Sequence, residues 1–178
     1  MPRDDVTVTP DDKDWTWVIE QRCPECGFDA SAITCTDVSD MLRGAVGRWH
    51  YVLTSRPDVR ERPSPEVWSP LEYGCHVRDV FRVYNGRVRR MLDEDGPHYL
   101  NWDQDQTALD DNYAAQDPSA VAEEVVIDGG QLAALFDSVK GERWQRTGFR
   151  SDGAAFTVDT LSRYFIHDIL HHLVDVGA

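Results

Sequence analysis

Three of the six histidines in the chain lie within six residues of one another near its end. The segment is RYFIHDILHHLVDV, residues 163–176, and its histidines are His167, His171 and His172. Imidazole nitrogens are common ligands of zinc, nickel and similar divalent metals. Two interpretations therefore compete: the histidines are polar interruptions of a packing face, or two of them bind a metal ion.

Helical spacing places the three histidines on two different sides of the predicted helix. At about 100° per residue, His172 falls with Asp168 and Asp175 on a narrow polar side, which predicts a surface imidazole. His167 and His171 are four residues apart and share another side, which we expect to face the interior. Unpaired buried polar groups are costly, and one divalent cation would satisfy both rings. Core histidines that hydrogen-bond within the protein are the alternative.

A third histidine is available on an earlier predicted helix. His76 lies beside the apolar stripe of that helix and faces partly inward. A helical bundle can bring His76 opposite His167 and His171. Three neutral imidazoles would bind zinc or nickel and leave positions open for water or substrate, as a catalytic site requires. We predict these three histidines as the metal ligands.

Four amphipathic helices would position these side chains. The second has clear start signals: Ser69 as the N-cap, Pro70 at the first helical position and Glu72 to complete a capping box. Apolar residues recur at helical spacing in the four segments 37–54, 70–93, 118–139 and 157–176. This pattern predicts an all-α protein, a four-helix bundle with long connections that follows an irregular N-terminal arm.

The chain divides into an arm at residues 1–36 and a bundle at residues 37–178. Within the arm, WTWVIE predicts a short strand and CPECGFD predicts a turn. The polar connection at 96–117 has a length typical of lids and binding loops. The link at 140–156 is rich in turn residues and favours a short irregular hairpin.

Two segments of the chain resemble the DinB superfamily, a group of bacterial metal-binding four-helix proteins. They are WSPLEYGCHVRDVF at 68–81 and FTVDTLSRYFIHDILHHLVDV at 156–176. They match the family pattern of one histidine on the second helix and an H-x-x-x-H pair on the last. The resemblance covers roughly residues 37–176, so the arm with its C-P-E-C motif is an addition to the family pattern.

The resemblance implies a DinB-like bundle with an unusual crossover and a divalent metal on His76, His167 and His171. It also implies an activity, because some members are transferases or isomerases that use mycothiol or bacillithiol, maleylpyruvate isomerase being the best-known example. By resemblance, a low-molecular-weight thiol is then the cosubstrate, and a homodimer is expected. A bound metal lowers the pKa of a coordinated thiol, so that the thiolate nucleophile can exist at neutral pH. A non-catalytic binding or stress-response module with a structural metal is the alternative.

Cys23 and Cys26 form a C-x-x-C motif whose role the sequence leaves open. The motif could be half of a zinc site, a redox pair or two incidental thiols. A structural zinc would need two further ligands, for which Cys35 and Cys75 are candidates. We favour a structural role, because the residues that follow predict a turn rather than the helix start of a redox motif. Cys75 points about 100° away from its neighbour His76, so we expect it to be packed.

Three further side chains are candidates for a pocket around the metal. Tyr164 lies on the inward side of the last predicted helix, Trp102 in the polar connection, and Asp79 three residues after His76. Simpler interpretations compete for two of them. Trp102 would anchor the connection to the bundle, and Asp79 would be a solvated helix charge.

The composition restricts the classes of function. The net charge is −14, from 18 basic and 32 acidic residues. Binding to nucleic acids or to anionic membranes needs a basic surface, so we expect neither. No apolar run approaches the ~20 residues of a membrane span, and the first residues lack an apolar signal core, so we expect a cytoplasmic protein. In that compartment the four cysteines would be thiols or ligands, and the expected partner is a small-molecule substrate.

Overall fold

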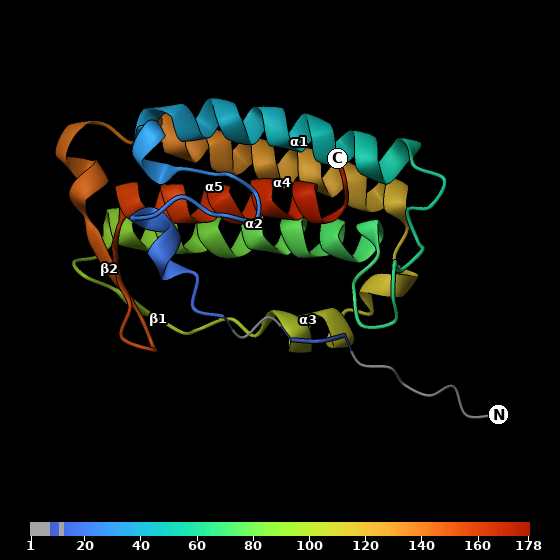
Figure 1. Cartoon of the computed structure of the whole chain (residues 1–178). Coiled ribbons are helices and arrows are strands. Elements are labelled where there is room, and N and C mark those ends of the chain that lie inside the picture. Colours follow the sequence, from blue (N-terminus) through green and yellow to red (C-terminus); the bar gives the residue numbers. More distant parts are fainter. Residues whose placement is uncertain (1–7, 11–12) are drawn as a thin grey trace.

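Four long helices lie side by side and form the body of the protein (Figure 1). The computed structural model describes residues 8–10 and 13–178. The long helices are α1 (Val38–Ser55), α2 (Pro70–Asp93), α4 (Pro118–Ser138) and α5 (Val158–Asp175). α4 packs most extensively on α1 and α2, and α5 also packs on α1 and α2. The predicted all-α bundle is confirmed, and the helix ends agree with the predicted ones to within one or two residues.

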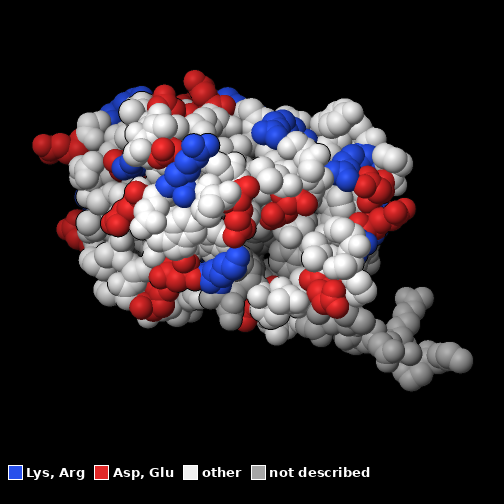
Figure 2. Space-filling model, viewed as in Figure 1, with Lys and Arg blue, Asp and Glu red and all other residues white. Residues whose placement is uncertain are grey.

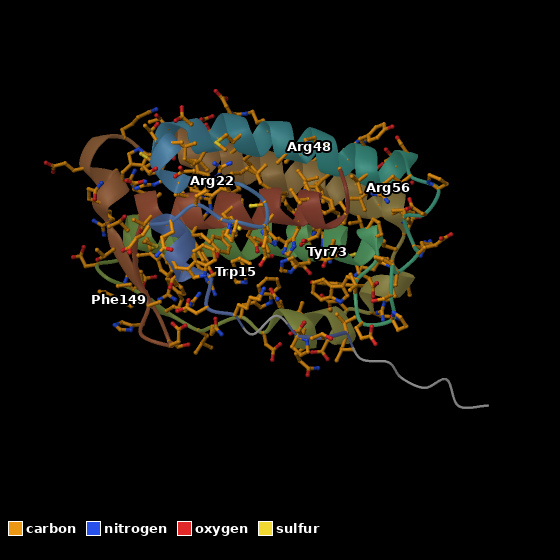
Figure 3. All side chains as sticks on the ribbon, in the orientation of Figure 1. Trp15, Arg22, Arg48, Arg56, Tyr73 and Phe149 are labelled. Atoms are coloured by element: carbon orange, nitrogen blue, oxygen red, sulfur yellow. The ribbon has the colours of Figure 1, made fainter. Side chains whose placement is uncertain are left out.

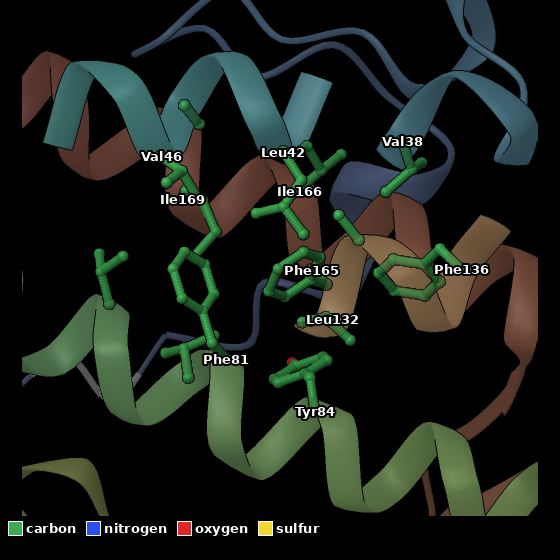
Figure 4. Close-up of a cluster of buried hydrophobic side chains, with 14 of the residues drawn as sticks. Val38, Leu42, Val46, Phe81, Tyr84, Leu132, Phe136, Phe165, Ile166 and Ile169 are labelled. Atoms are coloured by element: carbon green, nitrogen blue, oxygen red, sulfur yellow. The ribbon is translucent and has the colours of Figure 1, made fainter. Parts of the chain in front are cut away.

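The apolar faces of the four helices meet in one core (Figure 4). At its centre, the ring of Phe165 on α5 lies 5.2 Å from the ring of Tyr84 and 6.0 Å from that of Phe81, both on α2, and 5.8 Å from that of Phe136 on α4. Burial of apolar surface contributes about 25 cal/mol per Å² to folding. One side of α5 is therefore committed to the core, and its other sides are left for polar residues.

The start of α2 is stabilised by the predicted capping box. The Ser69 side chain accepts a hydrogen bond from the backbone N–H of Glu72, and the Glu72 carboxylate accepts one from the backbone N–H of Ser69 at 2.8 Å. Arg62 donates two hydrogen bonds to the same carboxylate, at 2.9 and 2.5 Å. This network defines where α2 begins and so fixes the position of His76, one turn further along the helix.

The polar connection between α2 and α4 contains more structure than its sequence predicts. It forms the short strand β1 (His98–Tyr99), the seven-residue helix α3 (Gln104–Asp110) and the 3₁₀ turn η4 (Tyr113–Ala115). Asp103 caps α3 by accepting a hydrogen bond from the N–H of Gln106 at 2.9 Å. No residue of α3 is fully buried. Its sequence therefore lacks the apolar periodicity by which longer helices are recognised.

A small sheet lies at one end of the bundle. The predicted hairpin is present as β2 (Thr147–Arg150) and β3 (Ala155–Thr157), which are antiparallel and pair Phe149 with Ala155. β1 adds in parallel to β2 and pairs His98 with Phe149. Its two residues are too few for a sequence pattern, and the sequence did not predict a three-stranded sheet.

The described part of the arm packs on α5 through short turns. These are the 3₁₀ turns η1 (Thr16–Ile19), η2 (Ala30–Ala32) and η3 (Cys35–Asp37). The strand predicted for WTWVIE is wrong, because these residues form η1 and the turn that follows it. The turn predicted for CPECGFD is confirmed: Gly27 has a φ of +78° and donates its N–H to the carbonyl of Cys23 at 2.9 Å. Residues 1–7 and 11–12 of the predicted arm lie outside the described residues, and the division of the chain into arm and bundle stays a prediction.

Charged side chains of both signs are mixed on the face that Figure 2 shows. Ion pairs also link the helices: Arg78 on α2 lies 2.8 Å from Glu124 on α4, and Arg82 lies 2.6 Å from Asp128. Among the residues that the structure describes, none of the helices combines the length and the apolar character that crossing a bilayer requires.

Candidate metal centres

Among the described residues, side chains of the types that can bind a metal ion gather in two groups on two sides of α5. In each group the donor atoms all lie within 4.8 Å of one another. The first group, which we call the Cys/His cluster, comprises Cys23, Cys26, His167 and His171. The second, which we call the pocket cluster, comprises His76, Asp168 and His172.

The structure does not bring the three predicted ligands together. His76 lies with His172, their ring centroids 5.0 Å apart, whereas His167 and His171 belong to the Cys/His cluster. The prediction of a surface position for His172 is wrong, because its side chain is only 13% exposed. Helical spacing separated the two sides of α5 correctly. The side assigned to solvent is covered, however, by α2 and by the segment that leads into α3.

The carboxylate of Asp168 lies between the two imidazoles of the pocket cluster. Its Oδ2 is 3.5 Å from Nε2 of His76, and its Oδ1 is 3.4 Å from Nε2 of His172. Nδ1 of His172 lies 2.8 Å from Oδ2 of Asp175. A carboxylate in this position holds the proton on Nδ1, so Nε2 is the nitrogen that would bind a metal. Two Nε2 atoms and one carboxylate thus face a common point.

The ring of His76 is buried, and its polar atoms lack partners. It is 1% exposed, and within the described part of the chain neither nitrogen has a hydrogen-bond partner. The 3.5 Å approach of Asp168 is too long to provide one. Trp102 stacks on the ring with a centroid distance of 5.5 Å and an interplanar angle of 3°, and Trp68 contacts it at 5.5 Å. Unpaired buried nitrogens are costly, and a divalent metal ion would satisfy His76. The donor set of the pocket cluster therefore fits such an ion.

Electrostatic attraction between carboxylates and imidazoles determines the protonation states in the pocket cluster. Burial alone would lower the pKa of His172, but the carboxylates of Asp168 and Asp175 raise it to about 10. Burial likewise opposes ionisation of Asp168, yet His172 and His76 hold the pKa of that carboxyl well below its ordinary value. A metal ion that binds here at neutral pH would meet a carboxylate and displace a proton from His172.

The pocket cluster lies in the wall of a cavity of about 470 Å³. The wall is built from α2, residues 101–105, Arg150 and Asp152 of the hairpin, α5, and residues 13–15 of the arm. A cavity of this size suits a small molecule. The pocket cluster is therefore accessible to a ligand, and no single element of the fold forms the pocket alone.

Of the three residues predicted to line a pocket, the structure places two in this cavity. Tyr164 and Trp102 are part of its wall. Trp102 also donates its indole N–H to Oγ1 of Thr107 at 2.8 Å, so it anchors the connection as well. Asp79 is instead buried outside the cavity, where it pairs with Arg78 at 2.9 Å and accepts a hydrogen bond from the Tyr113 hydroxyl at 2.5 Å. Its carboxylate supports the packing of η4 on α2.

In the Cys/His cluster, the rings of α5 face the C-x-x-C loop of the arm. Nδ1 of His171 lies 3.8 Å from Sγ of Cys23, and its Nε2 lies 3.5 Å from Oε2 of Glu25. Nε2 of His167 is buried and has no hydrogen-bond partner among the residues described. Burial raises the pKa of the Cys26 thiol to about 11, the opposite of what a redox-active cysteine requires.

The other two cysteines lie outside both clusters. All four are free, and neither Cys35 nor Cys75 completes the site begun by the C-x-x-C motif. Cys75 is buried, with Sγ 3.9 Å from the carbonyl oxygen of Tyr113, in agreement with its predicted packing role. The sequence contained a signal for the missing ligands, since C-x-x-C and H-x-x-x-H together make a common zinc ligand set. The prediction places the two motifs in different sites, whereas the structure brings their side chains together.

Comparison with known proteins agrees with this fold. Residues 36–174 match the family model of the DinB superfamily. A similar solved structure is "YfiT from Bacillus subtilis", which its description calls "a probable metal-dependent hydrolase with an unusual four-helix bundle topology". The two chains are 13% identical, with a TM-score of 0.71 over 80% of this chain and 85% of YfiT, a level of identity that shows the fold alone. No curated protein matched. Since the family model spans all four long helices, the chain belongs to the DinB superfamily, as its two segments around the histidines had suggested.

Proposed function

We propose that this protein is a metal-dependent enzyme that acts on a small molecule, and that His76, Asp168 and His172 bind its metal. The observation that carries the proposal is the convergence of two Nε2 atoms and one carboxylate in the wall of a 470 Å³ cavity. Three protein ligands beside an open space are typical of catalytic metal sites, whereas structural sites are closed by a fourth ligand. Two imidazoles and a carboxylate suit zinc or nickel.

The nucleophile of the reaction would come from outside the protein. Among the described residues, the cavity wall contains no cysteine, serine or threonine. A metal ion in the pocket cluster would lower the pKa of a bound thiol or water, so that its anion is present near neutral pH. Given the resemblance to thiol-dependent members of the family, we propose a low-molecular-weight thiol such as mycothiol as the cosubstrate of a transfer or isomerisation.

Two guanidinium groups in the cavity wall would position the substrate. Arg87 lies over the ring of Tyr99, 4.6 Å from its centroid, and donates a hydrogen bond to the carbonyl of Leu100 at 3.1 Å. Arg150 pairs with Asp152 at 2.7 Å. Because both cations are held by their neighbours, little side-chain freedom is lost when they bind a ligand. We propose that they recognise a carboxylate or a hydroxyl-rich group on the substrate or the thiol.

Hydrolysis at the same site is a second candidate. It is favoured by the structural similarity to YfiT, which is described as a probable metal-dependent hydrolase. The same pocket cluster would then activate water in place of a thiol.

The experiment that separates these candidates uses protein loaded with Co²⁺. If a thiol binds at the pocket cluster, the thiol should increase the sulfur-to-cobalt charge-transfer absorption of the wild type but not that of His172→Ala. Mass spectrometry of a panel of electrophilic substrates, with and without the thiol, then identifies the products. Thioether or isomerised products that require the thiol support the first candidate, and hydrolysis without it supports the second. Bound metal with neither product would overturn both and leave a non-catalytic, metal-stabilised module.

A further inference from the structure

The Cys/His cluster supplies no ligand to the metal of the function proposed above and none of its four residues lines the cavity. We propose that Cys23, Cys26, His167 and His171 form a closed structural site for Zn²⁺ or a similar thiol-binding divalent cation, which fastens the arm to α5. This proposal concerns a different ligand set from that of the pocket cluster, and either can be correct without the other.

The loop of the arm is shaped to present two thiols on one side. The N–H of Cys23 donates to the carbonyl of Phe28 at 2.8 Å, and the N–H of Gly27 donates to the carbonyl of Cys23 at 2.9 Å. The turn needs a left-handed residue directly after Cys26, and Gly27 supplies it with a φ of +78°. These two hydrogen bonds close the loop around Cys23 and Cys26.

The helix presents two imidazoles to that loop. His167 and His171 are one turn apart on α5, with ring centroids separated by 5.2 Å. The four donor atoms lie within 4.8 Å of one another, although Cys23 and His171 are 148 positions apart in the sequence. Zn–S bonds of about 2.3 Å and Zn–N bonds of about 2.0 Å place tetrahedral donors roughly 3.3–3.8 Å apart, so a small contraction would complete the site.

One buried nitrogen atom of the Cys/His cluster is available to bind a cation. Nε2 of His167 has no hydrogen-bond partner in the described part of the chain, and the ring is enclosed by Trp15 and Phe28, each 5.5 Å away. A disulfide between Cys23 and Cys26 would leave that nitrogen unsatisfied, whereas a cation satisfies it. Behind His171, the Glu25 and Asp175 carboxylates approach Nε2 at 3.5 and 3.6 Å. Such carboxylates orient histidine ligands in metal proteins.

The chemistry of this ligand set indicates a structural role. Two thiolates and two neutral imidazoles neutralise a divalent cation and fill its four positions, so none remains for a substrate. Ion binding would release the thiol protons. The pocket cluster, in contrast, has three ligands and faces a cavity.

A metal in the Cys/His cluster would also shape the pocket. Trp15 contacts the rings of both His171, at 5.0 Å, and His167, and it lines the cavity together with Lys13 and Asp14. Figure 3 shows Trp15 between the helices and the chain that carries β1 and α3. The regular structure in the described part of the arm consists of short 3₁₀ turns, and ordering its backbone costs about 1–2 kcal/mol per residue. The free energy of metal binding would offset this cost and hold one wall of the pocket in place.

Metal analysis of the full chain tests the proposal. Purified wild type should contain about two zinc-class ions per chain when both clusters are filled. Cys26→Ser should lose the ion of the Cys/His cluster and keep that of the pocket cluster, and His76→Ala should show the reverse. Cys35→Ser, which alters a partly buried cysteine outside both clusters, should keep both ions. If Cys26→Ser loses an ion and His76→Ala does not, the result supports this inference and counts against the proposed function.

A second measurement needs no variant and so does not depend on whether Cys26→Ser folds. Wild type loaded with Co²⁺ should show sulfur-to-cobalt charge transfer and tetrahedral cobalt bands before any thiol is added. Removal of the metal should make the arm sensitive to proteases while the helical circular dichroism is retained. The proposal is overturned if the Co²⁺-loaded wild type shows no sulfur–cobalt absorption and if both Cys23 and Cys26 of the zinc-supplemented wild type react with a thiol reagent. Unchanged metal content in a folded Cys26→Ser protein would also overturn it.

Discussion

His171 and His172 are adjacent on α5, with ring centroids 6.0 Å apart, yet they belong to different clusters. Asp175 contacts both of them: its Oδ1 lies 3.6 Å from Nε2 of His171, and its Oδ2 lies 2.8 Å from Nδ1 of His172. One carboxylate on the last turn of α5 therefore supports an imidazole on each of two sides of the helix. The two candidate metal sites are linked through this residue as well as through the shared helix.

We expect Asp175→Asn to weaken metal binding at the pocket cluster about 10- to 100-fold, because the neutral amide no longer fixes the proton on Nδ1 of His172. The effect on the Cys/His cluster should be smaller, since Glu25 also lies 3.5 Å from His171. Competition titration with a chelator, followed by metal analysis, measures both affinities. Glu25→Gln is the matched control and should affect only the Cys/His cluster. Equal affinity of wild type and Asp175→Asn at the pocket cluster would show that Asp175 does not orient His172.

Trp102 should report on metal binding at His76, because their rings are stacked 5.5 Å apart. Ni²⁺ is paramagnetic, and its binding to the pocket cluster should quench nearby tryptophan fluorescence. We expect Trp102→Phe to lose a larger part of this quenching than Trp144→Phe. Trp144 is the control, because its ring stacks on Phe136 and not on a histidine of the pocket cluster. If both variants are quenched like the wild type, Ni²⁺ does not bind beside Trp102.

The sequence predicts the long helices because their signals are local. The capping box of Ser69 and Glu72 and the apolar stripes of the helices lie within a few residues or turns. α3 and β1 carry no such signal: none of α3's residues is fully buried, and β1 has two residues. Their conformations depend on contacts with the rest of the fold.

The ligand sets could be predicted only in part, because they depend on which segments cover α5. Helical spacing correctly divided His167 and His171 from Asp168 and His172. Assigning the second pair to solvent assumed that a polar side is an exposed side. In the structure a cavity lies on the side of Asp168 and His172. The C-x-x-C loop covers the other pair, although Cys23 and His171 are 148 positions apart in the sequence. No periodicity within one helix contains that information.

The ion pair of Arg62 and Glu72 should make stability depend on pH. Burial would raise the pKa of Glu72, but hydrogen bonds from Arg62 and Ser69 lower it below its ordinary value of 4.5. A carboxyl with a depressed folded-state pKa stabilises the protein above its unfolded pKa, and this contribution is lost as the pH falls through the folded value. We expect Glu72→Gln to lower the free energy of unfolding at pH 7 by about 1–3 kcal/mol.

Urea unfolding at several pH values measures this difference, which should shrink as the pH falls below 4.5. Glu123→Gln, an exposed substitution on α4, is the control and should change stability by less than about 0.5 kcal/mol. A constant difference between wild type and Glu72→Gln from pH 7 to pH 3 would mean that the charge of Glu72 is not the source of its effect.

The adjacent glycines of α4 should respond in opposite directions to the same substitution. A Cβ on Gly129 would overlap the Val46 side chain on α1 and lie 3.0 Å from Cε2 of Phe81 on α2, whereas a Cβ on Gly130 would meet nothing within 4 Å. Overpacking costs about 1–3 kcal/mol, so we expect Gly129→Ala to destabilise the bundle by that amount. Gly130→Ala should stabilise it by up to about 1 kcal/mol, because alanine has the higher helix propensity. Urea unfolding of the two variants side by side provides the measurement. If both were stabilised equally, α4 would not approach α1 and α2 as closely at Gly129 as the structure indicates.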